Sequence, residues 1–248
     1  MRNRLSNWRV LWLLLVLAWS PVISAQQAQE QSDKPLSYGF VSPNTRQNLK
    51  LEEAIKGMSS AEESKLLNQA LNLSCVVRSP IRAFRALGSW SDGAEHSVML
   101  RFKSDHETLR YVLSRMGRDA EQKYVIYFHP QPSGKADLYR LWLRKRPQNL
   151  VALTNALERG GIPFRTLVPT IQGTAVYIID LDRDLREKIL AVAQKLGAQV
   201  SYQAGNATLF GDDLRQKAKD TFEQEIQKYE AKNPGLPPTC DVRRKTGH

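Results

Sequence analysis

A strand–helix–strand pattern that recurs along the chain limits its fold more than any other feature. Strands are expected at 97–102, 124–128, 138–143, 164–168, 174–180, 200–203 and 207–210. Apolar residues recur at helical spacing at 105–116, 149–158, 185–196 and 213–230. Of the 248 residues, 42% are hydrophobic and 25% are charged, which excludes a wholly disordered or collagen-like chain.

Units of this kind, when hairpins join them, build an antiparallel sheet with the helices on one face. We therefore expect an α+β fold made of ferredoxin-like strand–helix–strand repeats. Residues 97–168 are expected to form one βαββαβ unit, and residues 173–230 a second βαββα unit. Whether the two units share one sheet or pack as separate domains stays open.

The rest of the chain divides by composition. Residues 26–48 are rich in Gln, Ser, Asn and Pro and are expected to be a flexible leader. The segment 49–96 is expected to hold two short helices, at 51–57 and 61–72, followed by a strand and a turn. Residues 231–248 form a tail with several prolines.

Residues 1–25 have the features of a secretory signal peptide. Arginines at positions 2, 4 and 9 precede an apolar run of about ten residues, and small residues follow up to Ala25. That run is short of the roughly twenty residues that a membrane-spanning helix needs. We expect cleavage after Ala25, a periplasmic or secreted protein, and no transmembrane anchor after cleavage. The alternative is an uncleaved N-terminal anchor.

The charge of the chain points to anionic partners. The formal net charge is +11, and it falls to +8 once the signal segment is removed. A basic mature protein favours anionic partners such as nucleic acid, lipid headgroups or acidic glycans, and export argues against intracellular RNA. We therefore expect an envelope protein or an anionic or glycan envelope component as the partner, and no nucleic acid.

The two cysteines, Cys75 and Cys240, gain meaning from export. In an oxidising compartment such a pair usually forms a disulfide. The chain-entropy account assigns a loop this long about 4–5 kcal/mol of stabilisation. The alternative, a redox-active pair, lacks the close Cys-x-x-Cys spacing which that chemistry favours.

A candidate binding surface follows from the alternation of side chains along two strands. On the strand expected at 97–102, Val98, Leu100 and Phe102 share one face, and on the strand expected at 138–143, Tyr139, Leu141 and Leu143 do. The opposite face of these two strands carries Arg101, Lys103, Arg140, Trp142 and Arg144. We expect the two strands to be central neighbours and this face to be uncovered. Guanidinium groups bind phosphate or carboxylate oxygens, and a tryptophan ring can stack on a sugar or a base. The alternative is that Trp142 packs beneath another segment while the arginine stems cover it.

A second cluster has the residue types of general acid–base catalysis. Asp92, Glu95 and His96 lie beside a glycine turn, and a carboxylate–imidazole group can transfer protons. The simpler interpretation is a turn followed by a strand entry, because Asp92-Gly93 is a common turn dipeptide. The remaining histidines lack metal-ligand spacing, so we expect no metal and no cofactor.

These features favour a non-enzymatic exported protein that binds or assembles a component of the cell envelope. A secretion, conjugation or cell-wall system is a suitable setting. The alternative is an envelope hydrolase or transferase that uses Asp92, Glu95 and His96. An inhibitor or immunity-type protein for an exported enzyme would differ from the first interpretation only in its partner.

Overall fold

A computed structural model of the chain describes residues 34–42, 61–90, 93–144, 150–162, 165–170 and 172–237. The expected signal segment 1–25, the expected helix at 51–57, Asp92 and Cys240 lie outside these residues. Among the helices that are described, none combines the length and the apolar character needed to cross a membrane.

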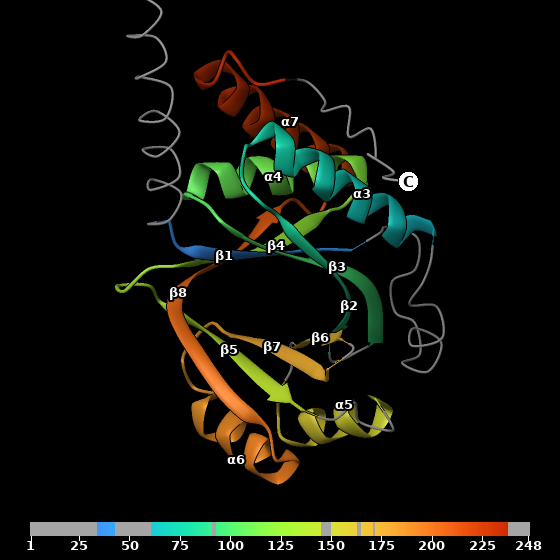
Figure 1. The fold of residues 1–248 in the computed structure, drawn as a ribbon, viewed down its shortest axis with the longest axis vertical. Coiled ribbons are helices and arrows are strands. Elements are labelled where there is room, and N and C mark those ends of the chain that lie inside the picture. Colours follow the sequence, from blue (N-terminus) through green and yellow to red (C-terminus); the bar gives the residue numbers. More distant parts are fainter. Residues whose placement is uncertain are drawn as a thin grey trace, which may run out of the picture. The chain divides into compact units, whose positions relative to one another are not determined.

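The described residues form eight strands, which close into one antiparallel barrel, and five helices around it (Figure 1). The strands are β1 (Leu36–Val41), β2 (Arg82–Trp90), β3 (Gly93–Lys103), β4 (Tyr124–Pro130), β5 (Ala136–Leu143), β6 (Arg165–Pro169), β7 (Thr174–Asp180) and β8 (Gln199–Gly211). The helices are α3 (Ala61–Val76), α4 (His106–Asp119), α5 (Leu150–Arg159), α6 (Arg186–Leu196) and α7 (Arg215–Lys232). Every strand pairing is antiparallel, so the expected α+β class with an antiparallel sheet is confirmed.

The barrel consists of two halves with the same order of elements. Residues 36–130, the first half, run β1–α3–β2–β3–α4–β4, and their strands lie side by side as β4–β1–β3–β2. Residues 136–211, the second half, run β5–α5–β6–β7–α6–β8, and their strands lie as β8–β5–β7–β6. The outer strands of the two halves pair with each other, β4 with β8 and β2 with β6, and this closes the barrel.

This grouping differs from the expected units. The expected leader 26–48 contains β1, the central strand that pairs with both β3 and β4. Because β1 begins the first half, the units are 36–130 and 136–211 rather than 97–168 and 173–230. Consequently β3 and β5 are not neighbours: β3 pairs with β1 and β2, whereas β5 pairs with β7 and β8.

The last strand passes continuously from one half to the other. The expected strands 200–203 and 207–210 are one strand, β8, which pairs with β5 at its start and with β4 at its end. Gly205 lies at the junction and is the register partner of both Ala136 and Pro130. A Cβ atom there would lie 2.4 Å from Phe128 Cζ and 2.5 Å from the His129 carbonyl oxygen, so the close approach requires glycine.

The hydrophobic residues separate into an interior cluster and two outer ones. The interior cluster draws on strands of both halves, including Tyr38, Met99, Leu138 and Tyr177. Helices α3, α4 and α7 pack on the outside of the first half, and α5 and α6 on the outside of the second (Figure 1). The helices are therefore on one face of the strands, as expected, but the other face is not open: it lines the barrel interior.

Candidate functional site

The predicted arginine-rich surface lies on the inner side of the barrel wall. Met99 and Leu138 belong to the interior cluster, so alternation turns Arg101 on β3 and Arg140 on β5 inward as well. Trp142 packs against the same cluster. All three side chains keep partial solvent exposure. The two arginines come from different halves.

Each arginine is paired with a tyrosine on the neighbouring strand. Tyr38 is the register partner of Arg101, and Tyr177 is the register partner of Arg140. Such partners have Cβ atoms about 5 Å apart on the same face. The two tyrosine rings meet across the interior with centroids 5.8 Å apart. Arg101, Tyr38, Tyr177 and Arg140 therefore form a continuous layer across the barrel, which we call the arginine–tyrosine layer.

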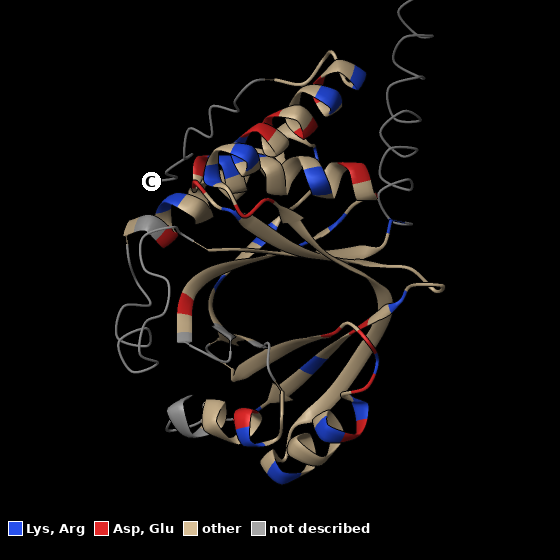
Figure 2. Ribbon diagram, turned by 180° about the vertical axis from the view of Figure 1, so that it is seen from behind, with Lys and Arg blue, Asp and Glu red and all other residues tan. Residues whose placement is uncertain are grey.

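Both guanidinium groups of this layer lie against aromatic rings rather than carboxylates. Arg101 Cζ lies 5.7 Å from the centre of the Phe84 ring, and Arg140 Cζ lies 5.2 Å from the centre of the Trp142 ring. Within the described parts of the chain neither guanidinium forms an ion pair or a hydrogen bond, and Arg140 Nε is buried. Figure 2 shows acidic and basic segments side by side on the helices, whereas the strands carry few charges.

Burial controls the protonation of the central tyrosine. Burial raises the pKa of the Tyr38 hydroxyl and Tyr177 adds to the rise, while the charges of Arg101 and Arg140 oppose it. Tyr38 therefore stays protonated at neutral pH and keeps an O–H group that can donate a hydrogen bond.

One side of the interior is polar and open to solvent. Ser201 and Gln203 on β8 are register partners of Arg140 and Leu138, so they occupy inward-facing positions. Both side chains are exposed. Their hydroxyl and amide groups can donate and accept hydrogen bonds next to Arg140.

The other members of the predicted surface lie at its margins. Lys103 ends β3 and Arg144 follows β5, and both side chains are exposed. The expectation that the two strands form an adjacent, uncovered sheet face was wrong. The structure instead brings Arg101, Arg140 and Trp142 to the inside of one barrel.

The alternative catalytic cluster is divided between the two faces of β3. Glu95 shares the inward face of Arg101, whereas His96 points to the outer side. There His96 Nδ1 lies 3.4 Å from Oε1 of Glu63, a buried carboxylate on α3. Asp92 lies outside the described residues. Neighbours on opposite faces of a strand cannot act on one substrate proton, so Glu95 and His96 do not form a joint site.

Only one of the two cysteines of the predicted disulfide lies among the described residues. Cys75 lies in the last turn of α3, and Cys240 is outside the described residues. Their pairing stays a prediction.

A histidine cluster at one end of α4 was not expected from the sequence. Ser37 Oγ lies 2.9 Å from His129 Nδ1, His106 Nε2 lies 3.0 Å from the Tyr127 hydroxyl, and the two imidazole rings are 5.7 Å apart. Burial lowers the pKa of both histidines; Arg110 lowers that of His106 further, and His106 lowers that of His129. Ser37 is fully buried, so no substrate can reach its hydroxyl. His106 and His129 are 23 positions apart in the sequence, so no short motif indicates that their rings lie close together.

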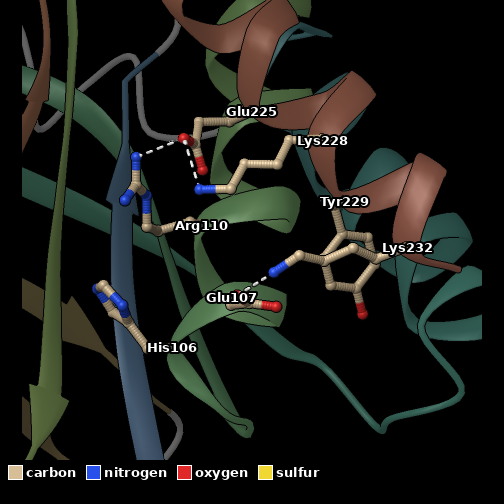
Figure 3. A pocket seen from close by; sticks show the side chains of 7 residues that line it. All are labelled: His106, Glu107, Arg110, Glu225, Lys228, Tyr229 and Lys232. Carbon is tan, nitrogen blue, oxygen red and sulfur yellow. Dashed lines mark hydrogen bonds and ion pairs between the residues drawn. The ribbon is translucent and has the colours of Figure 1, made fainter.

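A small pocket of about 100 Å³ lies between α4 and α7 (Figure 3). Its charges are already matched: Lys232 Nζ lies 2.6 Å from Glu107 Oε1, and Arg110 lies 2.8 Å from Glu225. A wider hollow of about 460 Å³ at the other end of these helices has the same mixed lining, with Arg118 paired to Glu223. These paired charges fasten α7 to α4 and leave little net charge for a ligand. No cluster of three potential metal ligands occurs among the residues that the structure describes.

Comparison with known proteins gives limited similarity. No protein-family model matches the chain. No curated protein matches it either. Among solved structures, it is similar to the small subunit of acetolactate synthase from Thermotoga maritima, with 13% identity and a TM-score of 0.26 over 71% of this chain and 96% of that one. It is also similar to an unknown protein from Galdieria sulphuraria, with 9% identity and a TM-score of 0.19 over 69% of this chain and 98% of that one. At these TM-scores neither likeness carries an argument about fold or function.

Proposed function

We propose that this chain is an exported, non-enzymatic protein that binds an anionic component of the cell envelope inside its barrel. One observation carries the proposal: Arg101 and Arg140 both face the interior beside aromatic rings, and within the described residues neither has a carboxylate partner. The exported location rests on the sequence of residues 1–25 and on the basic charge of the rest.

The physical reason is the cost of a partly buried charge without a counter-ion. A guanidinium stays protonated in proteins, so it cannot avoid desolvation by losing its proton. Buried charges are normally paired, because burial without a partner is unfavourable. Two such groups in one interior are best explained by a ligand that supplies the negative charge. The rings of Trp142 and Phe84 add an apolar surface for the rest of that ligand.

The strand order of the halves supports a finer description of the fold. Spatial order 4-1-3-2 in a βαββαβ chain is that of a ferredoxin-like unit. We propose that the chain contains two ferredoxin-like units, 36–130 and 136–211, closed edge to edge. We also propose a structural disulfide between Cys75 and Cys240.

The proposal is tested by crosslinking in cells with the C-terminally tagged full-length chain, followed by a high-salt wash. High salt removes contacts that depend only on a basic surface attracting anions. We expect the wild-type chain to retain an anionic envelope component, identified by mass spectrometry, and the Arg101→Gln/Arg140→Gln double variant to lose it.

Arg186→Gln is the matched control, because Arg186 also lies over an aromatic ring, 5.8 Å from the centre of Tyr202, but on the outside of the barrel. It should capture as much as the wild-type chain. Equal capture by all three proteins would show that the barrel interior is not the binding site. Trp142→Ala is less suitable as a test, since Trp142 packs against the interior cluster and its loss should also destabilise the fold.

A further inference from the structure

We infer that the barrel interior binds one small dianionic group, a phosphate monoester, and that Arg101 of the first half and Arg140 of the second both bind it. This inference rests on the proposed function and specifies the ligand of the same site.

The charge of the interior indicates a dianion. By strand alternation, the basic residues at inward-facing positions are Arg82, Arg101, Lys103 and Arg140. On the described strands Glu95 is the only acidic residue at such a position. Arg82 and Lys103 are exposed, so water screens them, whereas Arg101 and Arg140 are partly buried. Two partly buried positive charges are matched by one group that carries about two negative charges, as a phosphate monoester does near neutral pH.

The geometry indicates a single shared group rather than two separate anions. The chain of contacts runs from Arg101 to its register partner Tyr38, across 5.8 Å to the Tyr177 ring, and on to Arg140. A guanidinium presents a fixed fork of N–H donors that fits phosphate oxygens, and a protonated tyrosine adds an O–H donor. In the proposed complex, donors from both halves contact one anion that lies beside Tyr38 and Tyr177.

The polar side of the interior is the side that solvent reaches. Ser201 lies opposite Arg140 and is exposed, so solvent reaches the wall next to this arginine. A phosphate monoester entering there would meet Arg140 first, and its organic part would remain near Ser201 and Gln203. Inward-facing polar side chains at that position suit a hydroxylated group such as a sugar.

The test is isothermal titration calorimetry of the full-length chain with inorganic phosphate, glycerol 3-phosphate and acetate. We expect both phosphates to bind more tightly than acetate. Arg101→Gln and Arg140→Gln should each weaken phosphate binding by about tenfold or more, the loss expected for a hydrogen-bonded charge partner. Arg186→Gln should bind as the wild-type chain does.

Ser201→Asp gives a second test that does not remove an interior arginine. Ser201 is exposed, so the substitution should be tolerated, and its carboxylate would lie opposite Arg140 and neutralise it. We expect it to abolish phosphate binding, whereas Ser201→Asn should keep it.

The outcomes separate this inference from the proposed function. Phosphate binding that needs only one of the two arginines, or that survives in both variants, overturns the shared site. Acetate binding as tight as phosphate binding, with dependence on both arginines, overturns the dianion and leaves an anion-binding interior. If none of the three anions binds and cellular capture does not depend on the arginines, both proposals fail.

Discussion

The two halves of the barrel are alike on the inside and different on the outside. In each half, the two central strands carry an arginine and a tyrosine as direct register partners. In the first half the tyrosine is on β1 and the arginine on β3, whereas in the second half the arginine is on β5 and the tyrosine on β7. Each half therefore has an arginine–tyrosine pair, with the two residues on opposite members of the pair of central strands. The feature that the halves share is the chemistry facing the interior.

The outer surfaces of the two halves differ. The first half is covered by three helices, and α7 is fastened to α4 by ion pairs such as Lys232–Glu107. Of the helices that the structure describes, two, α5 and α6, pack on the second half. The outside of the first half is therefore covered by more helices than that of the second, whereas both halves have an arginine–tyrosine pair facing the interior.

The largest effect on stability should come from truncating the buried Phe222 side chain, with which α7 packs against the first half. Phe222 is fully buried in the outer cluster of the first half. Phe222→Ala leaves a cavity there and should lower the free energy of unfolding by about 4 kcal/mol in urea titrations. Leu190→Ala on α6 is the counterpart in the second half and should cost less than about 1 kcal/mol, because Leu190 is 44% exposed. Similar losses for the two variants would mean that α7 is not part of the first half's core.

A smaller loss is expected where β8 crosses between the halves. Gly205→Ala would place a methyl group 2.4 Å from the Phe128 ring and against the backbone of β4, and the strain should cost about 2 kcal/mol. Gly235→Ala is the control, since a Cβ atom there has no neighbour within 4 Å. Unfolding by urea measures both. Unchanged stability in Gly205→Ala would show that the halves are not held as closely as the register indicates.

The smallest effect is on the pH dependence of stability, and it comes from two histidines of the first half. Burial lowers the pKa of His106 and His129 below the ordinary value of 6.5. A lowered folded-state pKa means that the unfolded chain binds protons more readily, so the stability these histidines contribute is present above pH 6.5 and is lost as the pH falls below it. The free energy of unfolding should decrease between pH 7 and about pH 5.

The double variant His106→Gln/His129→Asn should show a flatter pH dependence over that range, because it lacks both titrating groups. The two profiles are compared by urea titration at each pH. Parallel profiles would assign the acid sensitivity to other groups.

Local periodicity predicted most of the individual elements. The strand expected at 174–180 is β7, and the helices expected at 185–196 and 213–230 differ from α6 and α7 by a residue or two at their ends. The separation of the two faces of β3 is also confirmed, since Leu100 packs under the outer helices and Met99 in the interior. These features depend on residues close together in the chain, which is why the sequence contains their signal.

What could not be predicted depends on contacts between distant segments. The six residues of β1 lie in a segment whose composition is otherwise that of a leader, and their alternation is too short to outweigh it. Because β1 is not recognisable in the sequence, the first expected unit begins at residue 97, within β3, instead of at β1. The pairings β4–β8 and β2–β6, which close the barrel, join distant segments and have no local signal. The arginines of the candidate site were identified, but Tyr38 and Tyr177 were not, because only closure brings them together.

The most direct measurement is a crystal structure of the chain soaked in selenate, a tetrahedral dianion whose selenium atom gives an anomalous signal. If the arginine–tyrosine layer is the binding site, the strongest peak will lie inside the barrel, with selenate oxygens about 2.8 Å from nitrogen atoms of both Arg101 and Arg140. Peaks found only at outer arginines such as Arg186, with none inside the barrel, would contradict the account.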